Sequence, residues 1–388
     1  MSTSYHKTRM TYLSSISHDQ RYQQFKITES IPEFRKTYDY LNNGDVLETQ
    51  HSIAGRVYNV RYASKRLIFL DIQGAHLTDA SIDNNHLQIM LNKKSYHCAT
   101  EFDQLKQNLH RGDIIGVTGV PTKTSRGELS VIPSKCTILA PCLHELPVAL
   151  TDPKLILTKR YLDMMVNYRE VIKRYKVRSQ VISKMRRYME DVLHLTEVET
   201  PILTSQASGA AAKPFKTFHN DLKKDMHLRI APELNLKRLV VGGMGGVYEI
   251  GKQFRNEQID PTHNPEFTSC EMYLPYHTHN DLMKITEDMI CYIIDSVHSP
   301  PASGDGDDAE HSRIIQWGDV TIDWSPPFRC LDITTELTTK LGPMPSSYEG
   351  DEMRKFLDSK CTKLKFNCNE PRTTSRLLET IIEELVES

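Results

Sequence analysis

The sequence predicts an α+β protein in which a small β-barrel precedes a larger part, an antiparallel sheet flanked by helices. The first observation is a series of short segments between residues 45 and 140 whose side-chain character alternates with period two. The second is a stretch with apolar residues at helical spacing, 160–193. The third is a strand, a polar loop and a return strand between 247 and 273. Since the chain has 388 residues, each part is large enough for its own core.

The overall composition excludes several classes of protein. With 39% hydrophobic and 25% charged residues, the chain is ordinary for a globular protein, and no apolar run approaches the roughly 20 residues that span a bilayer. No membrane partner is therefore expected. The formal net charge of -2 gives no overall attraction to nucleic acid, so RNA binding needs a local basic surface. One candidate is the basic run between Lys173 and Arg187, which equally fits the solvated face of an amphipathic helix.

The eight cysteines are scattered, with no C-x-x-C pair and no His/Cys cluster at zinc spacing, so no metal ligands are assigned. This usage favours a reduced, cytoplasmic setting. The first eighteen residues contain Lys, Arg, Ser and Thr but no acid, as a transit peptide would. They have little arginine and no clear amphipathic period, so the cytoplasm is favoured over an organelle.

Residues 44–141 are expected to form the barrel, and 1–43 an N-terminal extension. The five alternating segments of the predicted barrel are HSIAGRVYNVRYA, RLIFLDI, HLQIMLN, DIIGVTGVPTKT and GELSVIPSKCTILA. If these five strands close into a barrel, no strand edge is left exposed. The OB-fold is the natural candidate for such a small five-stranded barrel. A helix over 101–109 falls between the third and fourth strands, where OB-folds usually have one. The polar segment 74–85 is predicted to be an inserted surface loop.

Proline and polar residues make 142–160 a linker to the second part. The helix that follows carries an apolar stripe, whose main expected role is packing in the core: Val171, Tyr175, Val181, Ile182, Met185 and Met189. Residues 196–203 (TEVETPIL) are predicted to form a short strand that ends at Pro201.

The stretch from Leu228 to Tyr273 is dense with charged and polar side chains. VYEI and FTSCEMY alternate as strands do, which predicts an antiparallel hairpin with one polar face. The loop between them carries Arg255, Asn256, Glu257, His263, Asn264 and Glu266. A solvated sheet edge would explain one or two charges. It would not explain glutamates at 233, 249, 257, 266 and 271, so a functional pocket is favoured.

The last third of the chain adds two predictions. Residues 299–312 (SPPASGDGDDAEHS) are acidic and of low complexity, which predicts a flexible surface loop. The final segment is predicted to be an amphipathic helix whose apolar face needs another surface to cover it. That face consists of Leu377, Leu378, Ile381, Ile382, Leu385 and Val386.

The polar hairpin also resembles a known family. FRNE followed by THNPEFTSCEMY resembles motif 2 of class II aminoacyl-tRNA synthetases, and LRIAPELNLKRLVVGG is close to the lysyl-tRNA synthetases in particular. The resemblance runs from about Gly44 to Ser388 and is most specific over 208–273. It implies an OB-fold anticodon-binding domain at 44–141 and a class II catalytic domain at 161–388. The long helix, strand and Pro201 resemble motif 1, the family's dimer interface, which implies a homodimer.

The resemblance implies a lysine–tRNA ligase, which activates lysine with ATP and transfers it to the lysine tRNA. This chemistry needs no protein nucleophile, because alignment and neutralisation of charge at phosphorus are sufficient. By its place in FRNE, Arg255 resembles the family's arginine that contacts the α-phosphate of ATP. The alternative is that Arg255 forms a structural ion pair. The residues matching ATP contacts are Arg255, Asn256, Glu257, His263, Asn264 and Phe267. Phe267 would stack on adenine, where core packing is the alternative, and His263 alone would fit an ordinary loop histidine.

A lysine substrate carries two ammonium groups, so its pocket must contain carboxylates. The residues matching the family's lysine contacts are Gly209, Glu233, Arg255, Glu271 and Tyr273. Glu233 follows a proline at an expected helix start, where a first-turn carboxylate is also favourable without any ligand. Several glutamates at one pocket favour lysine over the substrates of the related aspartyl and asparaginyl enzymes.

The barrel is expected to bind the anticodon, because unpaired bases are recognised by stacking on aromatic rings and by hydrogen bonds to their edges. Phe69 matches a base-stacking position. Arg61, Gln88 and Glu128 match positions that contact anticodon bases, and a purely structural role in a strand is the alternative for Arg61 and Gln88.

The sequence also departs from the family. Ser208 replaces a glycine, and Gly246 stands where an arginine is common. The last family motif, G-x-G-x-G-x-x-R, is not found, and its segment is expected to carry the Mg²⁺ ligands and a second ATP-binding arginine. The chain is therefore interpreted as truncated, with doubtful activity. The alternative is a non-catalytic fragment that binds tRNA or dimerises.

Overall fold

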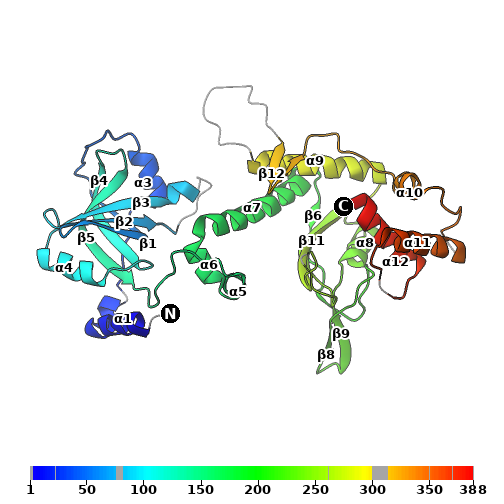
Figure 1. Ribbon diagram of the computed structural model, residues 1–388, viewed down its shortest axis with the longest axis horizontal. Helices are drawn as coiled ribbons and strands as arrows, with labels where there is room; N and C mark the ends of the chain where they lie inside the picture. The colour runs from blue at the N-terminus through cyan, green and yellow to red at the C-terminus, as the bar shows by residue number, and fades with distance from the viewer. Residues whose placement is uncertain are drawn as a thin grey trace. The chain divides into compact units, whose positions relative to one another are not determined.

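The computed structural model describes residues 3–21, 23–75, 82–260, 262–298, 313–348, 350–368 and 370–387. The chain divides into two compact units, Met1–Gln180 and Val181–Ser388, and each is described by itself (Figure 1). The predicted loop at 299–312 lies outside the described residues, as do positions 76–81 of the predicted loop at 74–85. None of the helices among these residues combines the length and apolar character needed to cross a bilayer.

The first unit contains a closed barrel of five strands, so the predicted OB-fold is confirmed. The strands are β1 (His51–Ser64), β2 (Leu67–Gln73), β3 (His86–Asn92), β4 (Ile114–Lys123) and β5 (Leu129–Ala140). Their order is β1-β2-β3-β5-β4, and β3 and β5 pair in parallel while the other pairs are antiparallel. Alternate side chains of β2 fill the interior, since Ile68, Leu70 and Ile72 are fully buried.

Short helices surround the barrel (Figure 1). They are α1 (Thr3–Ser15), α2 (His18–Arg21), α3 (Ile31–Tyr38), the 3₁₀ turn η1 (Ile82–Asn85) and α4 (Ala99–Asn108). α4 is the helix predicted between the third and fourth strands. α3 begins with a capping box, in which the Glu33 carboxylate accepts the Ser30 N–H at 2.9 Å and the Ser30 hydroxyl accepts the Glu33 N–H. Phe34 and Tyr38 of α3 pack into the barrel core.

The predicted long helix is interrupted. Predicted over 160–193, it consists of α6 (Arg160–Val166), α7 (Tyr168–Arg187) and the π-helical turn η2 (Tyr188–Val192). A further helix, α5 (Pro153–Thr158), lies within the predicted linker 142–160. The break between α6 and α7 falls at Asn167. The Asn167 side-chain amide donates to Asp163 Oδ1 at 2.9 Å and to the Leu150 carbonyl at 2.8 Å. Such side-chain hydrogen bonds compete with regular helix.

The expectation that the apolar stripe of this helix packs in the core is wrong for most of the stripe. Only Val171 and Met189 are buried, whereas Tyr175 is 48% exposed and the other stripe residues are half-buried. The physical reason is that other parts of the protein cover only some of these side chains. Met185 at the end of α7 and Met189 in η2 pack on Tyr248 of the neighbouring sheet, but the described residues leave Tyr175, Val181 and Ile182 incompletely covered.

The second unit is organised around a three-stranded sheet with the order β11-β10-β6. The strands are β6 (Thr196–Glu197), β10 (Val247–Phe254) and β11 (Glu266–Tyr273). β10 and β11 are antiparallel, so the predicted hairpin is confirmed. The predicted strand over 196–203 is wrong in length, since its pairing with β10 covers only Thr196 and Glu197. Its backbone then turns away, and Pro201 has no N–H to contribute to a ladder.

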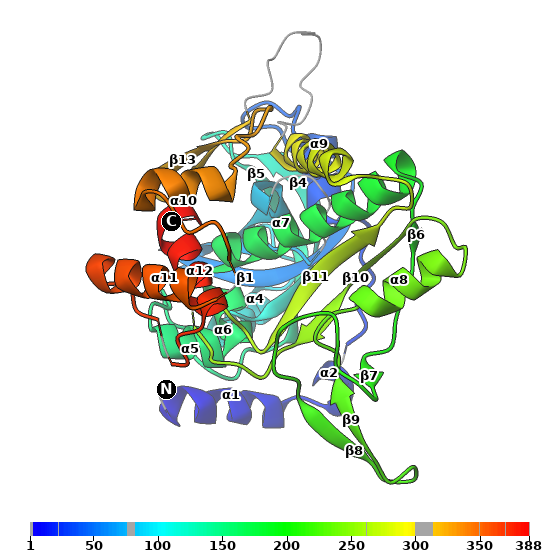
Figure 2. The same ribbon diagram turned by 90° about the vertical axis from the view of Figure 1, so that its right-hand side faces the viewer.

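Other elements surround this sheet. They are the small sheet β7-β9-β8, formed by β7 (Leu203–Thr204), β8 (Lys216–His219) and β9 (Lys224–Leu228), the helices α8 (Glu233–Val241) and α9 (His279–His298), and the hairpin β12 (Ile314–Trp317) and β13 (Val320–Asp323). Figure 2 shows β10 and β11 side by side with α8 next to them.

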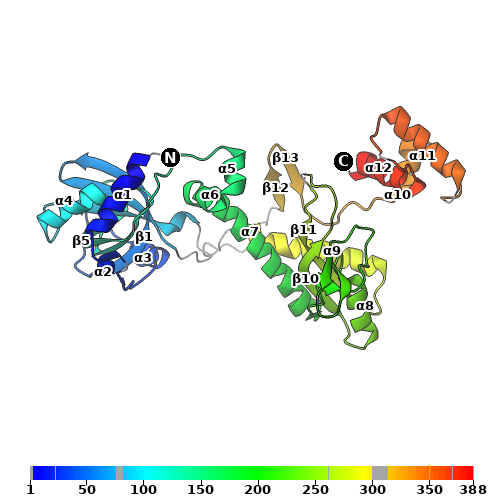
Figure 3. The same cartoon turned by 90° about the horizontal axis from the view of Figure 1, so that it is seen from below.

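The end of the chain forms a compact group of helices (Figure 3). They are α10 (Ile333–Leu341), α11 (Asp351–Leu364), α12 (Thr374–Ile382) and the π-helical turn η3 (Glu383–Glu387). Leu377 and Ile381 of α12 are fully buried against Leu337, Met353 and other apolar residues of α10 and α11. The predicted apolar face of the terminal helix therefore has the covering surface that it needs, and α10 and α11 provide it.

Candidate functional site

The β10–β11 hairpin has two chemically different faces. The register pairs Glu249 with Glu271, Gly251 with Ser269, and Gln253 with Phe267. Because side chains alternate along strands, these residues share one face. The opposite face is apolar and packs in a core with Met189 and Leu195: it carries Tyr248, Ile250, Cys270 and Met272. The apolar face anchors the hairpin, which leaves the polar face to line a site.

A buried ion pair lies on the polar face. Arg229 and Glu249 are 3% and 4% exposed, and Arg229 Nη1 donates to Glu249 Oε1. Thr200 donates its hydroxyl to Glu249 Oε2 at 2.7 Å and accepts from Arg229 at 3.0 Å. Arg229 Nε also donates to the Lys252 carbonyl at 2.9 Å. These hydrogen bonds compensate for the hydration that the Arg229 and Glu249 charges lose on burial.

Arg229 was not among the predicted site residues, although Glu249 was one of the five glutamates that indicated a pocket. The available signal was an arginine in the strand-like LRI, 20 residues before a glutamate in VYEI. Neither residue type is usually buried unless it is paired.

Three carboxylates converge beside Tyr273. Burial raises the pKa of Glu271 above its ordinary value; the hydrogen bond from Tyr273 lowers it, and Glu233 and Glu249 raise it further. The Tyr273 hydroxyl donates to Glu271 Oε2 at 2.9 Å. Burial and this bond also raise the pKa of Tyr273. Among the described residues, no basic nitrogen lies within 4.0 Å of the Glu271 carboxylate. Glu271 is therefore a partly buried acceptor that a cation would stabilise.

Gly209 and Glu233 lie together, as the sequence predicts. Gly209 has φ +92°, and a Cβ atom there would lie 3.1 Å from Glu233 Cβ. At the start of α8, Glu233 accepts from Lys237 Nζ at 2.6 Å, and this ammonium also lies 5.8 Å from the centre of the Tyr273 ring. A cavity of about 300 Å³ adjoins this region, lined by Ser208, Arg229 and Ala231 among others.

Arg255 and Phe267 form the other end of the polar face. The guanidinium carbon of Arg255 lies 5.1 Å from the centre of the Phe267 ring. Within the described ranges, Arg255 Nε is buried without a hydrogen-bond partner, as are both amide atoms of Gln253 and the Ser269 hydroxyl. Buried polar atoms are rarely left unpaired, so these groups are available to a ligand. Gln253 and Ser269 were not among the predicted site residues.

The loop between the two strands holds the remaining predicted residues. The Asn256 N–H donates to the Lys213 carbonyl at 2.8 Å, and Glu257 Oε1 accepts the Lys213 N–H at 3.3 Å. His263 contacts Asp260, whose pKa is lowered to about 2 by the Thr262 N–H and by His263. Asn264 is exposed. Asn256 and Glu257 thus lie against the segment that contains Lys213, whereas His263 is turned towards Asp260.

On the barrel, Arg61 and Phe69 are opposite each other in β1 and β2, with the guanidinium 5.8 Å from the ring centre. Arg61 also donates to Asp71 at 2.9 Å, and Asp71 is opposite Gln88 in β3. Gln88 is 9% exposed and accepts the Ser130 hydroxyl. Glu128 is exposed at the turn before β5. The barrel therefore brings Arg61, Phe69 and Gln88 together across three adjacent strands.

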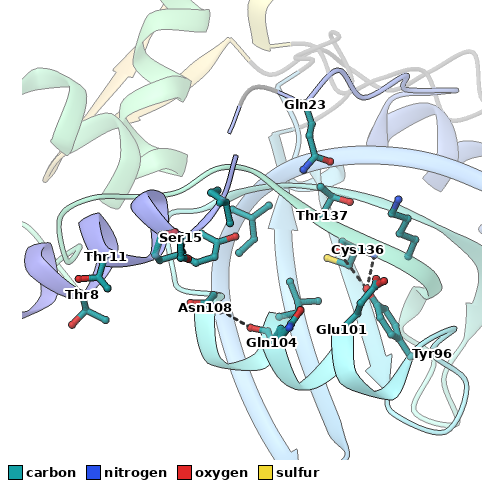
Figure 4. Close-up of a pocket in the computed structure, with 15 residues that line it drawn as sticks. Thr8, Thr11, Ser15, Gln23, Tyr96, Glu101, Gln104, Asn108, Cys136 and Thr137 are labelled. Carbon is teal, nitrogen blue, oxygen red and sulfur yellow. Dashed lines mark hydrogen bonds between the residues drawn. The ribbon is translucent and has the colours of Figure 1, made fainter. Parts of the chain in front are cut away.

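A separate cavity of about 950 Å³ lies in the first unit between α1, α4 and β5 (Figure 4). Its hydroxyl and amide groups mostly bond within their own helices. Thr8, Thr11 and Ser15 donate to α1 carbonyls, and Asn108 donates to the Gln104 carbonyl. These four side chains are therefore already bonded within α1 and α4.

No group of three or more His, Cys, Asp or Glu side chains that could hold a metal ion occurs among the described residues.

Comparisons with known proteins identify both units. Residues 152–369 match the family model of tRNA synthetases class II (D, K and N), and residues 51–139 match the OB-fold nucleic acid binding domain. The chain is 37% identical over 377 residues to lysine–tRNA ligase cla4 of Cladosporium cladosporioides, covering 94% of this chain and 60% of the relative.

Two further relatives come from distant organisms. The probable cytoplasmic lysine–tRNA ligase of Encephalitozoon cuniculi is 36% identical, with 94% of this chain and 69% of the relative covered. The lysine–tRNA ligase of Thermotoga maritima is 35% identical, with 91% and 66% covered. The chain thus spans 60 to 69% of the length of these curated relatives.

Proposed function

Since the chain belongs to the class II tRNA synthetases, and within them to the lysine–tRNA ligase family, we propose that it activates lysine with ATP and transfers it to the lysine tRNA. The observation that carries this proposal is the group of carboxylates at Tyr273. Glu271 is partly buried, has a raised pKa and lacks a close basic partner among the described residues. Such a group suits a substrate ammonium.

Lysine would lie between Glu271 and Glu233. Glu271 and the Tyr273 hydroxyl would hold one ammonium. Glu233 would hold the other in place of Lys237, its partner in this structure, while Gly209 leaves room beside Glu233. Arg255 would contact the lysine carboxylate. A neutral or acidic side chain would leave the Glu271 carboxylate without a cation, which supports lysine over aspartate or asparagine.

ATP would lie at the other end of the polar face. Phe267 would stack on adenine, and Arg255, with its free Nε, would hold the α-phosphate. Asn256, Glu257, His263 and Asn264 would line the rest of this site. The family implies magnesium with ATP, which would neutralise the phosphates.

The chemistry needs no covalent bond to the protein. A lysine carboxylate oxygen attacks the α-phosphorus, a new P–O bond forms, and the bond to the β-phosphate breaks with release of pyrophosphate. A ribose hydroxyl of the tRNA then attacks the carbonyl carbon, and AMP leaves. The contribution of Arg255 would be to align the reactants and stabilise the charge on the phosphate oxygens.

The remaining proposals concern partners and location. Arg61, Phe69, Gln88 and Glu128 would contact the anticodon, within a barrel domain of residues 44–141. A linker (142–160) and a catalytic domain (161–388) would follow. The half-buried stripe of α7 would form a homodimer interface. Two relatives are named as cytoplasmic, which supports a cytoplasmic location.

Lysine-dependent exchange of pyrophosphate into ATP tests the proposal. We expect exchange with lysine and none with aspartate or asparagine. Glu271→Gln should raise the KM for lysine about a hundredfold, by loss of a charge-assisted contact. The matched control is Glu266→Gln, which removes an exposed carboxylate paired with Lys252 on the other face. A folded chain without exchange that still bound the lysine tRNA would indicate the alternative function, binding without catalysis.

A further inference from the structure

One ammonium group of the protein lies beside the carboxylates that are proposed to hold lysine. Lys237 Nζ donates to Glu233 Oε1 at 2.6 Å, and the same nitrogen lies 5.8 Å from the centre of the Tyr273 ring. Tyr273 in turn donates its hydroxyl to Glu271 at 2.9 Å. The Lys237 side chain therefore contacts two of the groups that the substrate is expected to contact.

The helix α8 and its place beside the sheet explain both contacts. Glu233 is the first residue of α8 and Lys237 lies four positions later, so the two side chains share one face of the helix. A glutamate four residues before a lysine is the favourable order for such a pair. The helix lies next to β11, which carries Tyr273, and this brings the ammonium to the tyrosine ring (Figure 2).

The Lys237–Glu233 contact is exposed enough to be exchanged. The two side chains are 53% and 32% exposed, and water screens such ion pairs, so they add little to stability. The Arg229–Glu249 pair on the same site is 3% and 4% exposed and has further hydrogen bonds. Lys237 can therefore leave Glu233 easily, whereas Arg229 cannot leave Glu249.

The pairing is also exclusive within the part of the chain that the structure describes. There, Glu233 is the one carboxylate within 4.0 Å of the Lys237 ammonium, and Lys237 is the one basic side chain within that distance of Glu233. Carboxylates gathered at one site repel one another when no cation is bound. Lys237 thus supplies the cation that Glu233 needs while the pocket is empty.

We propose that Lys237 is an internal counter-ion that competes with the substrate for Glu233. In the empty pocket its ammonium pairs with Glu233; when lysine binds, the substrate ammonium takes this place and the Lys237 side chain turns to solvent. The inference rests on the proposed function, which places lysine in this pocket. Lys237 thereby lowers the affinity for lysine, and it keeps Glu233 paired against ligands that carry no ammonium.

A purely structural role for Lys237 predicts the opposite effect of its removal. If Lys237 only held Glu233 in position, Lys237→Gln would weaken lysine binding. If Lys237 competes with the substrate, the same variant binds lysine more tightly, because the substrate no longer displaces an ammonium. The sign of the change therefore decides between the two roles.

The test compares wild type, Lys237→Gln and Lys237→Arg in lysine-dependent pyrophosphate exchange. We expect Lys237→Gln to lower the KM for lysine about two- to fivefold, the usual strength of an exposed ion pair, with kcat unchanged. Lys237→Arg keeps the charge and should have a KM equal to or above that of the wild type. An unchanged or higher KM in Lys237→Gln, or a lower KM in Lys237→Arg, would overturn the proposal.

Two controls separate competition at Glu233 from a general effect of charge. Lys252→Gln removes an equally exposed ammonium, which pairs with Glu266 at 2.9 Å on the other face of β10, and should leave the KM unchanged. In a Glu233→Gln background, the gain from Lys237→Gln should largely disappear, because the carboxylate for which the two ammonium groups compete is absent. An equal gain in either control would show that Lys237 acts only as a distant charge, and the proposal would fall.

Calorimetric binding of lysine to the same proteins distinguishes failure of this inference from failure of the proposed function. Lysine binding to the wild type with no gain in Lys237→Gln would overturn the inference alone. Tighter binding in Lys237→Gln without any pyrophosphate exchange would support the inference and count against the proposed activity. A wild-type chain that binds no lysine would overturn both.

Discussion

The guanidinium of Arg229 lies directly over the backbone of Gly251, where a Cβ atom would come within 2.4 Å of Nη2. Arg229 cannot easily move aside, because its nitrogens bond to Glu249, Thr200 and the Lys252 carbonyl. The absence of a side chain at position 251 therefore allows the buried ion pair to form under the polar face.

Gly251→Ala should destabilise the second unit by about 1–3 kcal/mol, the usual cost of overpacking a buried site. Chemical denaturation of the full chain measures the change. The control is Gly242→Ala, since an added Cβ atom there meets only two carbonyl oxygens, at 3.3 and 3.4 Å. Equal stability of Gly251→Ala and the wild type would show that Arg229 does not occupy this position.

Glu271 should make both the stability of the fold and the binding of lysine depend on pH. Burial raises the pKa of its carboxyl group, so the folded chain keeps this proton at pH values where the unfolded chain has lost it. The contribution of Glu271 to the free energy of unfolding is thus greatest below pH 4.5 and falls as the pH rises through the raised pKa.

A bound ammonium has the opposite effect, because it favours the ionised carboxylate. Lysine affinity should rise with pH through the pKa of Glu271 and then level off, with a proton released on binding in that interval. Calorimetry in two buffers of different ionisation enthalpy measures this release. Glu271→Gln should show weak binding without the release, and a release of unchanged size in this variant would assign it to another group.

Arg255→Lys should lower the rate of pyrophosphate exchange by about 10²–10³, because lysine keeps the charge but loses the planar fork. The variant should stay folded, since the Arg255 guanidinium contacts the Phe267 ring and its Nε has no hydrogen-bond partner in the described part of the chain. Lys252→Gln changes an exposed cation on the other face of β10 and serves as the control. Equal rates for wild type and Arg255→Lys would remove Arg255 from the proposed mechanism.

Ile182→Glu should weaken a homodimer at least about tenfold, because it places a charge within the half-buried stripe of α7. Sedimentation over a range of concentrations measures the dissociation constant. The adjacent Ser183 is exposed, so Ser183→Glu adds the same charge outside the stripe and should leave the dimer intact. A wild-type chain that is monomeric at all concentrations would contradict the proposed interface.

Much of the candidate site follows from local sequence. The alternation in VYEI and FTSCEMY predicts which face of the hairpin carries Glu249, Phe267 and Glu271, and the register agrees with it. Arg229 was missed because an arginine next to a strand usually faces solvent, and only its contact with Glu249 shows otherwise. Gln253 and Ser269 were missed because a polar residue in a strand becomes noteworthy only when it is buried without a partner.

The sequence alone determined the five barrel strands, the polar hairpin and the family. These depend on period-two alternation, turn residues and a contiguous motif, all of which are local. Only the tertiary structure decided that α10 and α11 cover α12, that Arg229 pairs with Glu249, and that Lys106 of α4 bonds to the Lys65 carbonyl in the β1–β2 turn. Each of these joins segments far apart in the chain, and which distant segments meet is set by packing of the whole unit rather than by the residues on either side.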